Sequence, residues 1–211
     1  MSKQTELTDR DLIRIRLRFL DLLKSFFQDQ PDAELLSRWR GIFAALDGQH
    51  ITPDLDKASH ELGELLSSMP LQQIKDEHYI LFVDPYSKQL LPLTAAYYID
   101  GKSFGPSLAK YRDILKEGQV IKESDFTDSD DSLPIMLDVL IALIQEEKQG
   151  ESETRHLQDQ LLLDFLIPTV KAINTHMSST VDIRFYVKCV AFLAAYLELE
   201  LGLLEEETSR L

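Results

Sequence analysis

Histidine, cysteine and carboxylate side chains build most catalytic and metal sites, and this chain of 211 residues combines them sparsely. The nearest approach to a metal cluster is His60-Glu61 with Glu64, a spacing that places His60 and Glu64 on one face of a helix. A metal site needs three or more convergent ligands, so we expect this group to be a solvated helix face. Cys189 falls on an apolar stripe, where a thiol is buried and inert.

Motifs of known catalytic chemistry are absent from the sequence. It contains no H-E-x-x-H pair, no glycine-rich phosphate loop and no G-x-S-x-G turn. Adjacent carboxylates such as Asp130-Asp131 are expected by chance among 36 acidic residues. The single cysteine excludes an intrachain disulfide and any cysteine-based zinc or cluster site built from this chain alone. We therefore predict that the protein is not an enzyme and has no cofactor or metal.

A largely apolar stretch with two prolines, from Glu77 to Asp100, lies near the middle of the chain. Its helical beginning must end at Asp84-Pro85, because proline lacks an N–H and disfavours helical geometry in the residue before it. The remainder continues through Pro92 to Tyr97 and Tyr98, although connections between helices are usually polar. Two interpretations stay open: a connection buried beneath its neighbours, or a groove for an extended or helical peptide.

Charge and hydrophobicity limit the partners and the compartment. The net charge of −14 disfavours nucleic acid and anionic lipid, and it favours either basic partners or simple solubility. The sequence shows no signal-peptide pattern at its start and no run of about 18 apolar residues that could span a membrane. The lone cysteine fits a reducing environment. We expect a cytoplasmic protein without stable membrane insertion.

Apolar residues recur at intervals of three and four along most of the chain, which predicts helices. Thr8 and Asp11 predict a capping box at the start of the first helix, and Ser179 and Asp182 predict another before the last. The fold class is therefore all-α, a single-domain orthogonal bundle of about eight or nine helices over residues 1–211, with a hinge proposed at 117–131. The predicted helices span 9–28, 31–46, 53–68, 70–83, 106–116, 131–147, 153–176 and 180–204.

A few side chains carry both a structural and a functional interpretation. Trp39, the only tryptophan, either packs in the core or stacks on a ligand. Arg14, Arg16 and Arg18 are either solvated or paired with the acidic surface, or they bind an anion. Pro168 is expected to kink or split the helix that contains it.

Three sequence blocks resemble motifs of the TorD/DmsD/NarJ family of redox-enzyme maturation chaperones. Residues 77–85, EHYILFVDP, resemble the family's E-x-x-x-L-F-x-G-P. Residues 91–97 stand where the TorD and DmsD branches carry P-P-Y-E-S-V-Y, and residues 130–133 stand where the family has P-x-D-H-L. The chain differs at Asp84, Leu91, Ala95 and Ser132, which replace the motifs' glycine, first proline, serine and histidine. The string from residue 131, DSLPIML, is closer to the NarJ-like D-x-L-P-x-x-L.

The resemblance implies a TorD-like cytoplasmic chaperone that matures a molybdopterin-dependent oxidoreductase. Such a chaperone would bind the basic twin-arginine leader or N-terminus of the catalytic subunit and hold the apoenzyme until its cofactor is inserted. It would be a monomer or a domain-swapped homodimer. The alternatives are a NarJ-like assembly factor for a nitrate-reductase-type enzyme that is not exported, and a small helical ligand-binding protein or enzyme.

The resemblance also indicates which residues would line the peptide groove. Phe82 and Tyr97 would supply apolar contacts, and Asp131 would face the leader's arginines. Leu81 and Phe82 have ordinary core packing as their alternative role, and Asp131 has helix capping. The full predicted set is Leu81, Phe82, Pro85, Tyr86, Pro92, Tyr97, Tyr98, Asp131 and Ser132.

Overall fold

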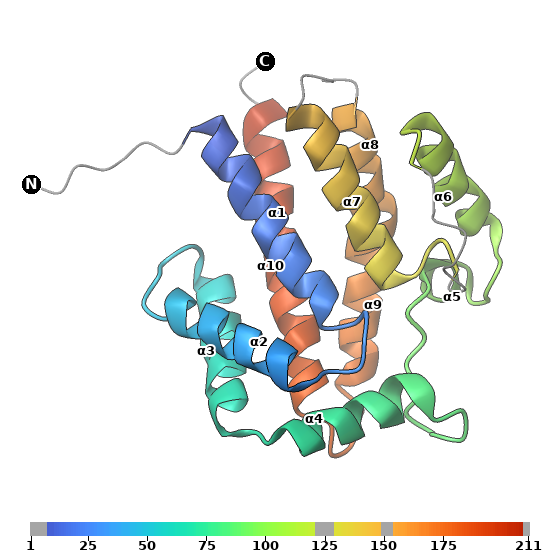
Figure 1. The fold of residues 1–211 in the computed structure, drawn as a ribbon. Coiled ribbons are helices and arrows are strands. Elements are labelled where there is room, and N and C mark those ends of the chain that lie inside the picture. Colours follow the sequence, from blue (N-terminus) through green and yellow to red (C-terminus); the bar gives the residue numbers. More distant parts are fainter. Residues whose placement is uncertain (1–7, 121–128, 149–153, 209–211) are drawn as a thin grey trace, which may run out of the picture.

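The computed structural model describes residues 8–120, 129–148 and 154–208, and these residues are mainly helical (Figure 1). In these three ranges the only β-type pairing is an isolated bridge between Thr94 and Ser132. The all-α prediction is therefore confirmed for the described part of the chain. If the continuous runs α4–η1 and α8–η3–α9 are each counted as one helix, the described part contains nine helices.

The boundaries of the long helices follow the predictions closely. Two segments, η1 and η3, are π-helical turns continuous with their neighbours. The elements are α1 (Asp9–Ser25), α2 (Ala33–Leu46), α3 (Pro53–Ser68), α4 (Leu71–His78), η1 (Tyr79–Val83), α5 (Ala95–Asp100), α6 (Pro106–Glu117), α7 (Leu133–Lys148), α8 (Arg155–Gln160), η3 (Leu161–Leu166), α9 (Ile167–Met177) and α10 (Phe185–Thr208).

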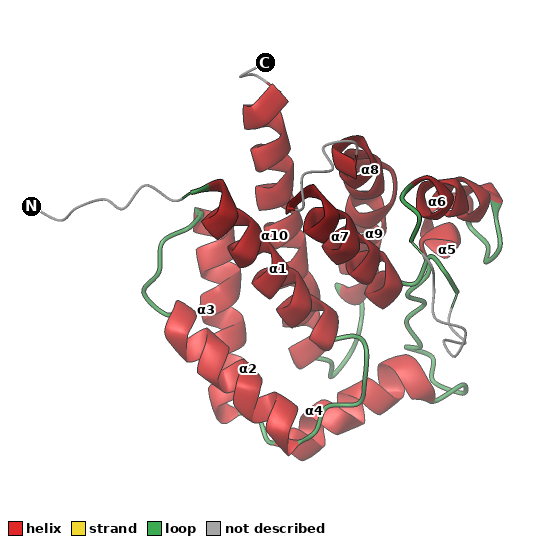
Figure 2. Cartoon of the chain, turned by 45° about the horizontal axis from the view of Figure 1, so that its top comes forward, coloured by secondary structure: helices red, strands yellow, loops and turns green. Residues whose placement is uncertain are grey.

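Helix α10 is the centre of the bundle, as its nearly continuous apolar sequence predicts. It packs against α3, α9 and α4, while α1 packs against α7 and α2 against α3. Helices α2 and α3 lie on one side of α10, and α5 and α6 lie on the opposite side (Figures 1 and 2). The aromatic side chains of Phe185, Tyr186, Phe192 and Tyr196 are all enclosed in the core.

Trp39 belongs to this core, which confirms the structural interpretation. Its ring lies 5.4 Å from that of Phe185 and 5.0 Å from that of Phe26, and no part of its surface is exposed. Its indole N–H donates to Ser25 Oγ at 2.9 Å, which satisfies the one polar group that the ring carries into the interior.

The two predicted capping boxes differ in outcome. At α1 the Thr8 side chain accepts from the Asp11 amide and the Asp11 carboxylate accepts from the Thr8 amide, as predicted. The prediction for the last helix is wrong, because α10 begins at Phe185 and Asp182 has a left-handed backbone with φ of 63°. The hydroxyl of Ser179 instead donates to the carbonyl of His176. The amides at the start of α10 are accepted by a residue from another helix, described below.

A short helix, α5, lies in the part of the apolar stretch after Pro85, where we predicted a largely apolar connection and no helix. It ends at Gly101, whose φ of 70° is favourable for glycine and closes the helix. In the α8–η3–α9 run, Pro168 sits in the first turn of α9 and the wider π turn η3 precedes it. Proline therefore splits the predicted long helix without ending its helical course.

Arg16 is paired with acidic groups, as one predicted interpretation had it, but the pair lies inside the protein and not on its surface. Only 5% of Arg16 is exposed, and its Nε and Nη2 atoms donate to the Glu200 carboxylate at 3.0 and 2.9 Å. Nη2 also donates to Gln158 Oε1 at 3.2 Å, and the Tyr196 hydroxyl donates to Glu200. This network joins α1 to α10 and α8, and it satisfies the charges that the interior encloses.

The proposed hinge at 117–131 falls largely outside the described residues. At its near edge Gln119 has a positive φ of 50°, and at its far edge Asp130 and Asp131 are held by hydrogen bonds. Residues 121–128 lie outside the part of the chain that the structure describes.

Candidate functional site

Main-chain hydrogen bonds bring the three motif blocks together. The Leu91 amide donates to the Leu81 carbonyl at 2.8 Å, which joins the second block to the first. The Leu133 amide donates to the Leu93 carbonyl at 2.8 Å, which joins the third block to the second. The bridge between Thr94 and Ser132 lies within this second junction. Sequence segments about forty residues apart therefore form one backbone unit.

Glu77, the first residue of the first block, caps α10 from a distance. Its carboxylate accepts the amides of Arg184 at 2.8 Å, Phe185 at 2.9 Å and Tyr186 at 3.3 Å. These amides belong to the start of α10, where N–H groups have no partner within the helix. Burial raises the pKa of Glu77 above its ordinary value, while the three amides act in the opposite direction. The role of this glutamate is to fix the angle between α4 and α10.

Asp131, in the third block, caps α5 in the same way. Its carboxylate accepts the Ala96 amide at 2.7 Å and the Ser129 hydroxyl, while its carbonyl accepts the Ala95 amide at 2.9 Å. Only 1% of Asp131 is exposed. The structure thus gives Asp131 a helix-capping role toward a neighbouring helix, which leaves its carboxylate unavailable to an arginine from outside.

Two further predicted site residues lie inside the protein. Leu81 has no exposed surface, and Ser132 is buried with a hydroxyl that has no hydrogen-bond partner within the described residues. Together with Asp131, these residues support the surface and do not form it. The remaining six predicted residues reach the surface to different extents.

Tyr86, at 92% exposed, is the most open of these six, and Pro85 beside it is also exposed. Tyr97 is 39% exposed and its ring meets that of Tyr98 edge-on at 5.0 Å. Tyr98 is half-buried, and its hydroxyl donates to the carbonyl of Pro92 at 2.9 Å. Burial raises the pKa of the Tyr98 hydroxyl well above its usual range.

Phe82 and Pro92 are half-buried. The Phe82 ring packs edge-on against Tyr186 at 5.0 Å and against His78 at 5.2 Å. Phe82 therefore touches the core through α10 and the solvent on its other side. Burial lowers the pKa of His78, so this imidazole is neutral beneath the surface.

Five exposed apolar side chains that were not predicted fall in the same stretch of sequence as Tyr86 and Tyr97. Seven of the eleven large apolar side chains that are exposed in the described residues fall between positions 79 and 104. The available signal was the apolar spacing within the first block, where positions 79 and 83 are one helical turn apart. We call this set the 79–104 surface; it comprises Tyr79, Val83, Tyr86, Leu90, Tyr97, Ile99 and Phe104.

The other residues considered for catalysis or metal binding, His60, Glu64 and Cys189, do not form a site among the described residues. His60 and Glu64 are both well exposed on α3, where His60 Nε2 lies 3.5 Å from Glu64 Oε1. No group of three or more potential metal ligands occurs among the described residues. Cys189 is buried, and burial raises the pKa of its thiol well above the ordinary value, as expected for an inert thiol.

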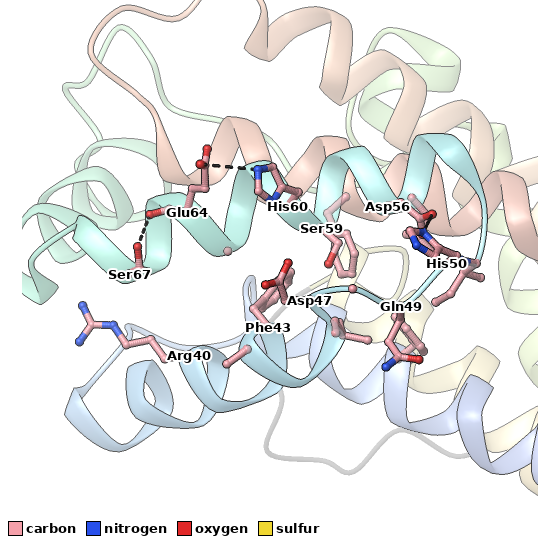
Figure 3. A pocket seen from close by; sticks show the side chains of 18 residues that line it. Arg40, Phe43, Asp47, Gln49, His50, Asp56, Ser59, His60, Glu64 and Ser67 are labelled. Carbon is pink, nitrogen blue, oxygen red and sulfur yellow. Dashed lines mark hydrogen bonds and ion pairs between the residues drawn. The ribbon is translucent and has the colours of Figure 1, made fainter.

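A pocket of about 670 Å³ lies between α2 and α3 and shares no residue with the 79–104 surface (Figure 3). It was not predicted, because it arises from the packing of two helices. Within the described residues, no helix combines the length and hydrophobicity needed to cross a bilayer.

The arrangement of the helices is similar to that of a protein of known structure. A crystal structure of a candidate redox enzyme maturation protein from Archaeoglobus fulgidus has a similar fold, with a TM-score of 0.51 and 16% sequence identity. The similarity covers 87% of this chain and 94% of that one. No curated protein matches the sequence.

The family follows from the sequence itself. Residues 48–171, more than half of the chain and including all three motif blocks, match the family model of the nitrate reductase delta subunit. The chain belongs to this family of NarJ- and TorD-like chaperones, which confirms the resemblance described above. It also confirms the predicted function at its general level, the maturation of a molybdenum-containing redox enzyme.

Proposed function

We propose that the 79–104 surface binds the basic N-terminal leader of the catalytic subunit of a molybdopterin oxidoreductase. The observation that carries this proposal is the concentration of exposed apolar side chains in this stretch, seven of the eleven in the described residues. Exposed apolar side chains that gather in one region are typical of interaction sites. A leader that is disordered when free would order as its apolar part covers these residues.

The supporting residues explain why these side chains stay outside the core. Glu77 fixes α4 against α10, and Asp131 fixes the start of α5. Leu81 and Leu91 are buried beneath, joined by a main-chain hydrogen bond. The segment between Leu81 and Leu91 therefore presents Tyr86 to solvent, and α5, whose start is capped by Asp131, presents Tyr97. A rigid frame of this kind lowers the entropic cost of binding.

The leader's positive charge meets the acidic surface of the chaperone, whose net charge is −14. Asp131 is engaged in capping, so we assign the local contact with arginine to Asp84, the residue that replaces the motif glycine. One Asp84 oxygen accepts the Tyr86 amide at 2.9 Å, and the side chain is only half-buried. Its second oxygen can accept from a guanidinium.

The test is calorimetry of the full chain with a synthetic twin-arginine leader peptide. Tyr86→Ser and Tyr97→Ala each remove an exposed aromatic ring, and we expect each to weaken binding about tenfold without changing stability. Leu163→Ser is the matched control, since Leu163 is exposed but lies in η3. The proposal fails if the peptide does not bind, or if the control weakens binding as much as the two tyrosine variants.

A second candidate differs only in the client. The matching family model is that of the nitrate reductase delta subunit, which favours a NarJ-like factor for a nitrate-reductase-type enzyme that is not exported. Purification of the chaperone with its bound subunit from the native host separates the two. A client whose N-terminus carries adjacent arginines followed by an apolar stretch supports the first candidate, and a client without them supports the second.

The proposal places the chaperone in the cytoplasm, where it binds its client and does not catalyse a reaction. It acts as a monomer or as a domain-swapped dimer that exchanges helices through the segment around residues 117–131. Light scattering coupled to size-exclusion chromatography distinguishes these two states.

A further inference from the structure

The pocket between α2 and α3 has the shape of a trough. Along α3, Ser59, His60, Gly63, Glu64 and Ser67 line one wall, at the spacing of a single helix face. This row covers eight residue steps, or about 12 Å at about 1.5 Å per residue. A space lined along its whole length by two helices suits an elongated occupant better than a compact one.

The opposite wall comes from α2 and the loop that follows it. Arg40, Phe43, Ala44 and Asp47 are spaced three, one and three residues apart, again on one helix face. Figure 3 shows the two rows facing each other across the space, with Arg40 and Ser67 at one end and His50 and Gln49 at the other. The trough is therefore about two helical turns long on both walls.

The floor of the trough is apolar and is formed by the protein core. Phe43, Leu55 and Phe192 are buried core residues beneath it, while Phe19 and Leu46 are half-buried and Ile51 is exposed, so these three supply its accessible apolar surface. At Gly63 the helix α3 comes close to α2: a Cβ added there would meet Phe43 Cβ at 3.6 Å, an ordinary contact, and a larger side chain would extend into the space between the helices. A volume of about 670 Å³ is large enough for one or two apolar side chains of a partner.

The rim carries more negative than positive charge. Asp47, Asp56 and Glu64 contribute carboxylates, and no hydrogen bond or ion pair of the Asp47 side chain occurs in the described residues. The only arginine of the rim, Arg40, is engaged by the carbonyls of Leu66 at 2.7 Å and Met69 at 3.0 Å. The charge available to a partner is thus acidic.

We infer that this trough is a second binding site, which takes a short cationic amphipathic helix of another protein. The helix lays its apolar side chains against Phe19, Leu46 and Ile51 and sets lysine or arginine beside Asp47 and Glu64. This is the geometry of helix-in-groove recognition, with anchors one turn apart. The site lies across α10 from α5 and α6 (Figures 1 and 2), and it does not depend on the proposed role of the 79–104 surface.

The probe is a synthetic amphipathic peptide of lysine and leucine with one tryptophan, titrated into the full chain and followed by fluorescence anisotropy. Gly63→Leu and Ala44→Phe each fill the trough, from opposite walls. We expect each to weaken binding at least tenfold. The matched controls are Gly41→Leu and Ala45→Phe, which place the same side chains on α2 outside the trough and should leave binding unchanged. Thermal melts verify that all four variants are folded.

Charge is tested with a second pair of variants. Asp47→Asn with Glu64→Gln should weaken binding several-fold and flatten its dependence on salt between about 0.05 and about 0.3 M. Asp113→Asn with Asp164→Asn removes the same charge from exposed positions on α6 and η3, and it should change binding little. The same peptide with glutamate in place of lysine should not bind.

The probe can also reach the 79–104 surface, so each titration is repeated in a chain carrying Tyr86→Ser and Tyr97→Ala. The loss caused by Gly63→Leu should persist there, which separates this inference from the proposed leader site. Unchanged binding in both trough-filling variants overturns the inference, as does equal binding of the anionic peptide. A concentration-dependent dimer that Ala44→Phe abolishes also overturns it, because a second copy of the chain would then occupy the trough.

Discussion

Replacing Glu77 with alanine should destabilise the whole bundle, although the substitution touches only one carboxylate. The carboxylate accepts three amides at the start of α10, and those of Phe185 and Tyr186 are buried. Each buried donor left without an acceptor costs about 1–3 kcal/mol. Removing a buried charge returns part of this free energy, so we expect a net loss of about 2–4 kcal/mol in the free energy of unfolding at neutral pH. For a chain of this size the melting temperature should fall by about 5–15 °C.

The assay is urea unfolding followed by far-ultraviolet circular dichroism, compared with Asp76→Ala. Asp76 is the neighbouring residue on α4, exposed, and bonded only to Gln72. Surface substitutions of this kind change stability by about 0.5 kcal/mol or less. If Glu77→Ala costs no more than Asp76→Ala, the carboxylate does not hold the start of α10 and the reasoning about the first motif block is refuted.

Three further predictions concern the same supporting contacts. Asp131→Ala removes the acceptor at the start of α5, so we expect a loss of about 1–3 kcal/mol in the free energy of unfolding, measured with urea. Leader binding should also weaken, because Tyr97 moves. A variant that binds the leader with full affinity would contradict this. Arg16→Met leaves Glu200 buried and unpaired, which should cost about 3–5 kcal/mol, and adding Glu200→Leu should restore most of it in a double-mutant cycle; additive losses would contradict a coupled pair. Burial raises the pKa of Glu77 in the folded state above its ordinary 4.5. The folded protein therefore holds this proton more tightly than the unfolded chain does. The contribution of this carboxyl group to the free energy of unfolding falls as the pH rises from about 4.5 through the raised pKa. Urea titrations across this range should therefore show the stability gap between the wild type and Glu77→Ala shrinking toward neutral pH, and a gap that widens would contradict the direction of the shift.

The sequence predicts the long helices well because their apolar periodicity and caps are local. The capping box of Thr8, the proline at the start of α3 and the apolar circumference of α10 all lie within a few residues of the feature they determine. The details that were predicted wrongly depend instead on residues far away in the chain. The start of α10 depends on Glu77, the existence of α5 on Asp131, and the burial of Arg16 on Glu200, each far away in the chain.

In the candidate site, too, the sequence predicts the local features and not those that depend on packing. The motifs pointed to the stretch that holds seven of the eleven exposed large apolar side chains of the described residues. Because the stretch is largely apolar throughout, the pattern could not separate supporting residues from exposed ones. Leu81 and Tyr86 differ only after α4 has packed on α10. The trough had no sequence signal, because it is a property of the distance between α2 and α3 and of the missing side chain at Gly63.

The hydrogen bonds that reach α10 have a consequence for biosynthesis. Helix α10 begins only at residue 185, so it is synthesised after α1 and α4, yet Glu77 and Arg16 find their partners on it. A nascent chain that stalls before α10 keeps a buried guanidinium without its carboxylate and a buried carboxylate without its amides, an arrangement that strongly disfavours folding. Prematurely terminated copies should therefore be removed by proteolysis before they compete for clients, so that only a fully translated chaperone takes part in enzyme assembly.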